Sequence, residues 1–503
     1  MEDSLQKRYA IKLLSNFVSG FINLLMVAIV PKELGPIAYG QFTYLQQFYN
    51  QVIAFLDAST STAFFTKLSA NNTRKELIFF YALFCLLVCS VLYAVIFLFE
   101  KFEYIGILTD EISIEYVYLG MWFGLLTWLT QIYIKISDAY ALTISVELIK
   151  ILHKLLMLGA LLFFINYLSF DLSLYFYFHF LSLISFIIII NILFYKKNIF
   201  LKNYFFVNIN IKGIIREFYT FCSPLFVFNC TAISIGIFDI WLLQKVSGSL
   251  ETGYYGLAYS IAAICFLFTS AMTPVITREF SKSFEEKNMQ EVSVLFRRYV
   301  PILYTISVFF SVFIAFEAEN LLSIFTDERF KGAYFSLVVI AFYPLHQTYG
   351  QINAALFFAT EDTISYRNTG LVSLFFGLFL SYLFIYLFEL GALGFAWKMV
   401  ISQFIAVNLQ LYFNVIKLKL NFFYFFAHQV YSLSFFCIIA YCSSYTPDIE
   451  SSLLGTFILR GLTYTSVVLL FLLIFPTVLG LEKNGLVKKL GELLNKFIRN
   501  KLS

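Results

Sequence analysis

The sequence predicts an all-α protein that crosses a membrane many times, and three observations support this. Of the 503 residues, 60% are hydrophobic and only 13% are charged, whereas soluble domains carry about 25% charged residues. The mean hydropathy is +0.80. Uninterrupted apolar runs, such as 181–194 and 467–478, are typical of membrane helices, because the strands of a membrane barrel instead show alternating segments.

Fourteen spans are predicted, because a membrane helix needs about 20 mostly apolar residues. The spans lie near 10–31, 41–65, 77–99, 114–135, 143–166, 172–194, 218–243, 254–277, 299–317, 333–358, 369–389, 392–415, 422–444 and 453–480. The expected parts are an N-lobe at 1–197, a basic cytoplasmic linker at 198–217, a C-lobe at 218–416, two further spans at 417–480 and a tail at 481–503. The tail is predicted to be an amphipathic helix at the membrane surface or, alternatively, a solvated helix packed on loops.

The positions of the basic residues test this arrangement independently, because cytoplasmic loops are enriched in Lys and Arg. With the N-terminus inside, 26 of the 35 basic residues fall in inside segments, five in outside loops and four within spans. The sequence therefore predicts fourteen spans with both termini in the cytoplasm. No outside loop is long enough for a separate domain.

Two short matches predict an internal repeat of six spans. Leu34, Tyr39 and Gly40 match Leu250, Tyr255 and Gly256 at a constant offset of 216 in the numbering. The start of span 5 (137–147) matches the start of span 11 (360–370) at an offset near 223. Because six is an even number, both halves would cross the membrane in the same sense and enclose a central cavity.

Span 5 has the densest group of ionisable residues at membrane depth, namely Glu147, Lys150, His153 and Lys154. Glu147, Lys150 and Lys154 share one helical face, and one carboxylate facing two ammonium groups leaves a surplus of positive charge. Such a face suits a phosphate-bearing substrate. The alternative is that Glu147 and Lys150 lie near the cytoplasmic interface and extend their charged groups to it. This alternative is less favoured for Lys154, because Lys154 lies three turns into the span.

Other polar residues within the spans are candidates for lining a lumen or coupling an ion, since charges at membrane depth are costly. Each has an alternative role. The amides could form hydrogen bonds between helices, the histidine could be a hydrogen-bonded structural residue, and the arginine could lie at the membrane interface. The candidates are Gln47, Asn50, Gln51, Asp57 and Ser61 in span 2, Asp239 in span 7, His346 in span 10, Lys398 in span 12 and Arg460 in span 14.

The sequence has no pattern typical of an enzyme or a metal site. We find no metal-ligand spacing, nucleophile elbow or phosphate-binding glycine loop, so no cofactor, metal or nucleic-acid partner is expected. The seven cysteines all fall within apolar stretches and are interpreted as small buried hydrophobes.

The chain resembles the multidrug/oligosaccharidyl-lipid/polysaccharide flippase superfamily, and within it the bacterial polysaccharide biosynthesis proteins, which include O-antigen flippases. The resemblance rests on Leu34-Gly35, Tyr39-Gly40 and Gln41-Phe42, and on 253–258 in the second half. It implies transfer of an undecaprenyl-pyrophosphate-linked oligosaccharide across the cytoplasmic membrane by alternating access, through a cationic lumen. Lys150, Lys154 and Lys398 are then the candidates for anion contact, and Asp57 and Asp239 for coupling to H⁺ or Na⁺.

Two rival functions remain open. A cation-coupled multidrug exporter of the same superfamily usually has twelve spans and an acid-rich cavity, whereas four basic residues and three acids lie within the spans here. A membrane polysaccharide polymerase or glycosyltransferase usually carries a large outside loop, which this chain lacks. If the chain is a flippase, a polymerase and glycosyltransferases of the same pathway are expected partners.

Overall fold

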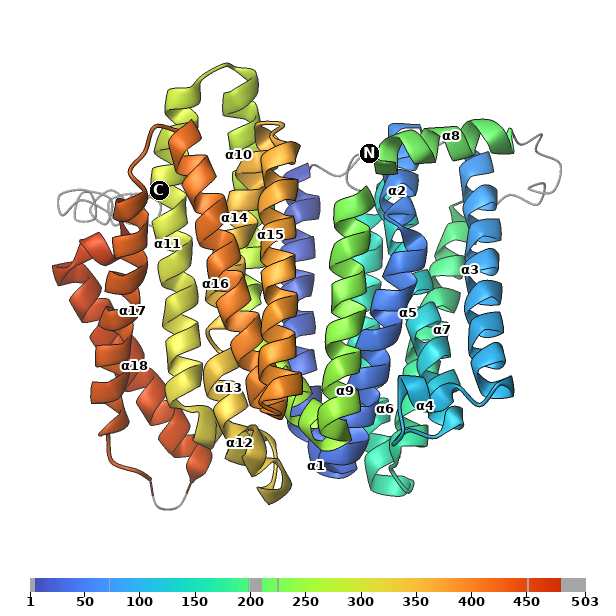
Figure 1. Ribbon diagram of the computed structural model, residues 1–503, viewed down its shortest axis with the longest axis horizontal. Helices are drawn as coiled ribbons and strands as arrows, with labels where there is room; N and C mark the ends of the chain where they lie inside the picture. Colours follow the sequence, from blue (N-terminus) through green and yellow to red (C-terminus); the bar gives the residue numbers. More distant parts are fainter. Residues whose placement is uncertain are drawn as a thin grey trace, which may run out of the picture. The chain divides into compact units, whose positions relative to one another are not determined.

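The computed structural model describes residues 5–71, 73–197, 199, 210–223, 226–449 and 452–480, and within these ranges every regular element is a helix (Figure 1). The first nine α-helices are α1 Leu5–Asp57, α2 Thr60–Ala70, α3 Lys75–Lys101, α4 Ile105–Leu108, α5 Ile114–Ala139, α6 Thr143–Tyr167, α7 Leu172–Lys196, α8 Ile211–Cys222 and α9 Phe226–Ala262. After the 3₁₀ turn η3 (Ala263–Cys265) come α10 Phe266–Glu285, α11 Met289–Phe316 and α12 Ala318–Phe325. Then follow η4 Glu328–Ala333, α13 Tyr334–Ile340, α14 Tyr343–Ala359, α15 Thr363–Ser381, the π-turn η5 Tyr382–Leu387, α16 Gly391–Lys417, α17 Phe422–Ser444, α18 Leu453–Ile474 and η6 Pro476–Leu479.

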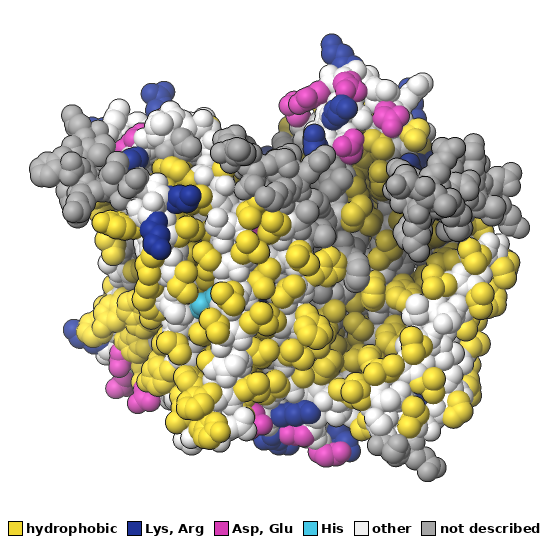
Figure 2. Space-filling model, turned by 180° about the vertical axis from the view of Figure 1, so that it is seen from behind, with side chains coloured by type: hydrophobic (Ala, Val, Ile, Leu, Met, Phe, Trp, Pro, Cys, Tyr) yellow, Lys and Arg dark blue, Asp and Glu magenta, His cyan; other side chains and the backbone are white. Residues whose placement is uncertain are grey.

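Eleven helices among the described residues are long and apolar enough to cross a membrane, so the chain is a multi-pass membrane protein. Helix α1 covers the first predicted span and most of the second, and α9 with α10 covers most of the seventh and eighth. Helices α13 and α14 together occupy the tenth. On the face drawn in Figure 2, hydrophobic side chains cover the middle and charged ones gather near two opposite edges, as expected for helices in a bilayer.

Side-chain caps explain where several helices begin, because an Asx or Ser oxygen satisfies a backbone N–H at a helix N-terminus. The Asp171 carboxylate accepts from the Leu174 N–H at 2.8 Å, and the Asn288 amide oxygen accepts from the Glu291 N–H at 3.0 Å. Ser452 caps α18 in the same way at 3.0 Å.

Two glycines bend α1 and α9 and reveal the internal repeat. Gly35 has φ 76° and ψ 169°, and Gly248 has φ 77° and ψ −178°, backbone conformations that favour glycine. The N–H of Ser249, freed by the second bend, donates to a Glu111 carboxylate oxygen at 2.7 Å. The two bends are related by an offset of 213 in the numbering, so the register of the repeat differs by three from the predicted offset of 216.

The turns before α6 and α15 also match. The Leu142 N–H donates to the Ser137 carbonyl at 2.8 Å, and the Asp362 N–H donates to the Phe357 carbonyl at 2.9 Å. The offset that relates these two hydrogen bonds is 220, not 223.

The chain divides into two compact units, one of residues 1–257 and 378–395 and the other of residues 258–377 and 396–503. In the first unit, Phe64, Leu77 and Phe194 belong to one apolar cluster. In the second, Phe296, Tyr349 and Phe425 belong to another.

Part of the predicted linker forms α8, which lies across the ends of neighbouring helices in the first unit (Figure 1). Ile214 and Phe218 on one side of α8 are buried, while Lys212 and Arg216 on another are exposed. Arg74 binds Glu217 of α8 at 3.0 Å, and hydrogen bonds to Glu217 and Glu76 raise the pKa of Arg74. The amphipathic pattern is typical of a helix at a membrane surface. The rest of the linker, and the predicted tail helix at 481–503, lie outside the described residues apart from Ile199 and Asn210.

Candidate functional site

Asp57 is the most heavily hydrogen-bonded of the predicted site residues. The α1 helix ends at Asp57, and the chain continues through Ala58 and Ser59, which both have positive φ. The buried carboxylate accepts from the Tyr81 hydroxyl at 2.7 Å, from the Ser61 hydroxyl at 2.8 Å and from the Ser61 N–H at 3.1 Å. It therefore caps α2, and the second predicted span is broken at this point.

Lys135 of α5, which was not among the predicted site residues, completes this cluster. Its ammonium group donates to the Ser61 hydroxyl at 2.7 Å. Ser61 in turn donates to Asp57, so one hydroxyl lies between a cation and an anion. Lys135 is the last residue of the predicted span 114–135, and span boundaries predicted from sequence are uncertain by several residues. The sequence therefore did not identify Lys135 as a residue at membrane depth.

The face of α6 holds the predicted charges in two separate contacts. Lys150 binds Glu147 at 2.5 Å, and the carboxylate of Glu147 is buried. Lys154, one turn further along, donates to the side-chain oxygen of Asn23 in α1 at 3.1 Å. Because that partner is a neutral amide, the second ammonium charge on this face is not neutralised by it.

The polar residues of the second span differ in their exposure. Asn50 is exposed, while Gln47 and Gln51 are half-buried. A Cβ built on Gly236 would lie 3.1 Å from the Gln51 amide, so Gln51 packs against α9. The structure does not gather the three amides into one cluster with Asp57.

Asp239 in α9 is buried and accepts a hydrogen bond of 2.6 Å from the Ser381 hydroxyl. Both residues belong to the first compact unit. The offset of 213 makes Met26 the counterpart of Asp239 in the first half of the repeat.

In the second unit, His346 and Lys398 are buried, and Arg460 is half-buried. His346 packs against the ring of Phe404 at 5.1 Å, and its Nδ1 has no hydrogen-bond partner within the described part of the chain. Lys398 is buried, and its Cε lies 3.5 Å from a Cβ built on Gly377. Arg460 binds Glu317 at 3.5 Å and Asp448 at 2.7 Å, so its charge is matched by two acids.

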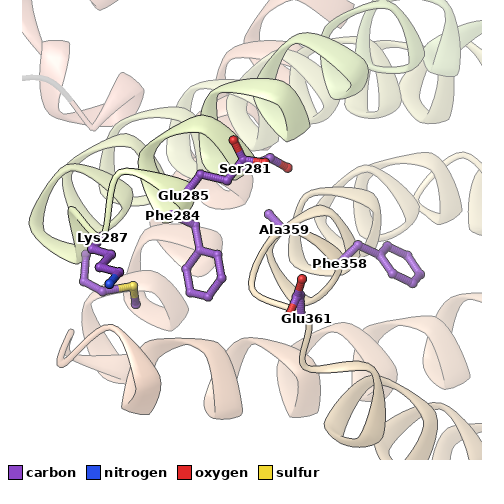
Figure 3. A pocket seen from close by; sticks show the side chains of 8 residues that line it. Ser281, Phe284, Glu285, Lys287, Phe358, Ala359 and Glu361 are labelled. Carbon is purple, nitrogen blue, oxygen red and sulfur yellow. The ribbon is translucent and has the colours of Figure 1, made fainter.

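A surface pocket of about 530 Å³ at the ends of α10 and α14 contains none of the predicted residues (Figure 3). Glu285, Glu361 and Lys287 line it together with Phe284 and Phe358. The mixture of charges gives it no preference for an anion.

No protein-family model matches this chain, and no curated protein matches it. Solved structures do match its fold. The inward closed conformation of the lipid II flippase MurJ superposes with a TM-score of 0.66 and 15% identity, over 92% of this chain and 98% of that one. An inward-facing multidrug resistance MATE family transporter of the MOP superfamily matches with a TM-score of 0.59 and 16% identity, over 83% and 95%.

A MOP superfamily transporter from Pyrococcus furiosus, with a binding pocket of reverse polarity, matches with a TM-score of 0.56 and 15% identity, over 83% and 97%. At these low sequence identities, the superpositions establish the fold but do not identify a substrate. The chain has the fold found in these MOP superfamily transporters.

Proposed function

We propose that this protein is a flippase for a polyprenyl-diphosphate-linked oligosaccharide, which it moves across the bacterial cytoplasmic membrane by alternating access. In this proposal the substrate is an undecaprenyl-pyrophosphate-linked repeat unit used for O-antigen, capsule or exopolysaccharide assembly. The lobes are those predicted from the sequence, and both termini are cytoplasmic. A polymerase and glycosyltransferases of the pathway act before and after it.

The proposal that the substrate is an anion rests on one observation, the surplus of positive charge on α6. Glu147 neutralises Lys150 at 2.5 Å, whereas Lys154 has an amide of Asn23 at 3.1 Å. Lys154 lies eleven residues after the first residue of α6, which is about 16 Å along the helix at ~1.5 Å per residue. A cation at that depth is costly without a counterion, and a diphosphate supplies one.

The acids have a different proposed role. Asp57 and Asp239 are buried and bound to hydroxyl groups, which makes them candidates for coupling transport to H⁺ or Na⁺. Lys398 and His346 remain candidates for the second half of the pathway, with Gln47, Asn50 and Gln51 as polar lining.

Asp239 also favours the second candidate function, a cation-coupled multidrug exporter, because a buried carboxylate attracts a cationic drug as well as a coupling ion. The MATE family transporter among the solved structures shares this fold. The two functions differ in the charge of the substrate, and that difference can be measured.

A binding experiment tests the anion site. The purified protein is titrated with undecaprenyl diphosphate, and quenching of its four tryptophans reports binding. In the variant carrying Lys150→Gln and Lys154→Gln, loss of charge-assisted contacts worth about 1.5–3 kcal/mol each should raise the Kd at least ~10-fold.

Lys245→Gln is the matched control, because Lys245 is also a lysine paired with a carboxylate, that of Asp110, but belongs to α9, three residues before the bend at Gly248. It should leave the Kd unchanged. Equal Kd values for the double variant and the control would remove the anion site from α6.

A further inference from the structure

A second basic site lies in the other unit, and none of the residues given a role in the proposed function lines it. A cavity of about 680 Å³ is lined by residues of α11, α17 and η6. Arg297 and Arg298 of α11 both line it, together with Tyr424 and Tyr431 of α17 and Thr477 of η6. Two guanidinium groups and several hydroxyl groups therefore meet at one cavity.

The arginines are held by aromatic rings and not by acids. The guanidinium carbon of Arg297 lies 5.3 Å from the centre of the Tyr424 ring, and that of Arg298 lies 5.6 Å from the Tyr299 ring. Neither arginine is paired with a carboxylate within the ranges that the structure describes. Stacking orients a guanidinium without using its N–H groups, so these donors remain available for a bidentate anion.

The opposite wall of the cavity is fixed in place by buried hydrogen bonds. The carbonyl of Val478 in η6 accepts from the Thr305 hydroxyl of α11 at 2.7 Å and from His428 Nε2 of α17 at 2.8 Å. These bonds tie η6 to both helices that carry the arginines and tyrosines. These hydrogen bonds therefore fix the positions of the three elements that line the cavity.

The depth of the cavity matches the boundary between bilayer and water. Arg297 contacts Tyr424, which is two residues after the first residue of α17, so the arginines are level with the first turn of a membrane helix. The positive-inside rule assigns this end of the helices to the cytoplasm. Ala427 and Tyr431 line the same cavity, lie deeper along α17 than Tyr424 and are exposed, giving the cavity a side that faces the hydrocarbon region.

We propose that this cavity binds an anionic phospholipid of the cytoplasmic leaflet, with its phosphate on Arg297 and Arg298 and an acyl chain along Ala427 and Tyr431. Anionic lipids concentrate at that surface, and basic pockets between membrane helices are suited to their headgroups. The lipid is a resident ligand of this unit and not the transported molecule. The proposal therefore stands independently of the proposed function.

Lipid binding to the delipidated, purified protein tests it, with phosphatidylglycerol as the probe and native mass spectrometry as the readout. Arg297→Gln with Arg298→Gln should raise the Kd for phosphatidylglycerol by about tenfold or more, through the loss of both guanidinium contacts. The conservative pair Arg297→Lys and Arg298→Lys keeps the charge but not the bidentate geometry, and should give a smaller increase. Tryptophan fluorescence during thermal unfolding checks that each variant is folded.

Arg278→Gln with Lys282→Gln is the matched control, since these are two exposed basic residues of α10 that do not line the cavity. It should leave binding unchanged, and phosphatidylcholine should bind the native protein weakly. An unchanged Kd in the Arg297/Arg298 variants, or equal binding of phosphatidylcholine, would overturn the proposal. Displacement by millimolar inorganic phosphate would make this a site for a free anion, and displacement by equimolar undecaprenyl diphosphate a site for the substrate; either result also contradicts a resident phospholipid.

Discussion

At the scale of single residues, the cluster around Asp57 shows how a buried charge is stabilised at a helix break. Replacing Asp57 with Ala removes the acceptor for the Tyr81 hydroxyl, the Ser61 hydroxyl and the Ser61 N–H. Each donor left unsatisfied costs about 1–3 kcal/mol, so we expect Asp57→Ala to lower the unfolding temperature of the purified protein by several degrees. Tryptophan fluorescence during heating measures this.

Asp110→Ala is the control for that experiment, because the Asp110 side chain is 65% exposed and lies in a loop. It should change the unfolding temperature little. If the two variants unfold at the same temperature, Asp57 does not hold the break between α1 and α2.

The sequence predicted Asp57 and Ser61 as functional candidates but not the contact of Ser61 with Lys135. A polar stripe on one helix identifies residues that need partners, yet the partner's helix and its rotation are set by packing. For the same reason the sequence could pair Glu147 with Lys150 on one helix, whereas the contact from Lys154 to Asn23 required the structure.

At the scale of elements, α1 and α9 cross at glycines placed symmetrically in the repeat. A Cβ on Gly40 would lie 1.8 Å from the carbonyl oxygen of Ser249, and a Cβ on Gly253 would lie 2.2 Å from that of Pro36. Gly40 and Gly253 are related by the same offset of 213 as the bends at Gly35 and Gly248. Small residues allow two backbones to approach this closely in a membrane.

Gly40→Ala should therefore destabilise the folded protein by about 3 kcal/mol, because one of the two helices must move away. The yield of monodisperse protein in detergent and its unfolding temperature should both fall. Gly159→Ala in α6 is the control, because nothing lies within 4 Å of its Cβ. Normal yield and stability of the Gly40 variant would show that this close crossing is not formed.

The short sequence matches placed the repeat near the right position but could not fix its register. Leu34 and Leu250 are identical, yet the bends that set the geometry are at Gly35 and Gly248. Chance identities between apolar segments can favour an alignment that does not pair the two bending glycines. The backbone conformation of each glycine shows which one bends its helix.

At the scale of the whole molecule, hydropathy predicted the all-helical, multi-pass architecture, because a bilayer imposes length and polarity on every span. The orientation predicted from the basic residues stays a prediction. The breaks within spans and the helical part of the linker were not predicted, since both depend on contacts with neighbouring helices. Arg74 with Glu217 is one such contact.

The predicted orientation can be tested with one cysteine on each side of α11. In a background without the seven native cysteines, an impermeant maleimide should label a Glu328→Cys protein in intact cells and a Lys287→Cys protein only after permeabilisation. Both positions are exposed, and α11 and α12 lie between them. The reverse pattern would invert the orientation, and equal labelling of both in intact cells would mean that α11 does not cross the membrane.

The central claim is that the substrate is a lipid-linked anion, and transport in proteoliposomes tests it most directly. A fluorescent polyprenyl-diphosphate oligosaccharide and a cationic dye are supplied in parallel, and the loss of inner-leaflet probe or lumenal dye is followed with time. The account predicts that the native protein moves the lipid-linked anion, that the Lys150→Gln and Lys154→Gln variant loses this activity at least ~10-fold, and that the dye is not moved. Transport of the cationic dye, with the lipid-linked anion left in its original leaflet, would contradict it.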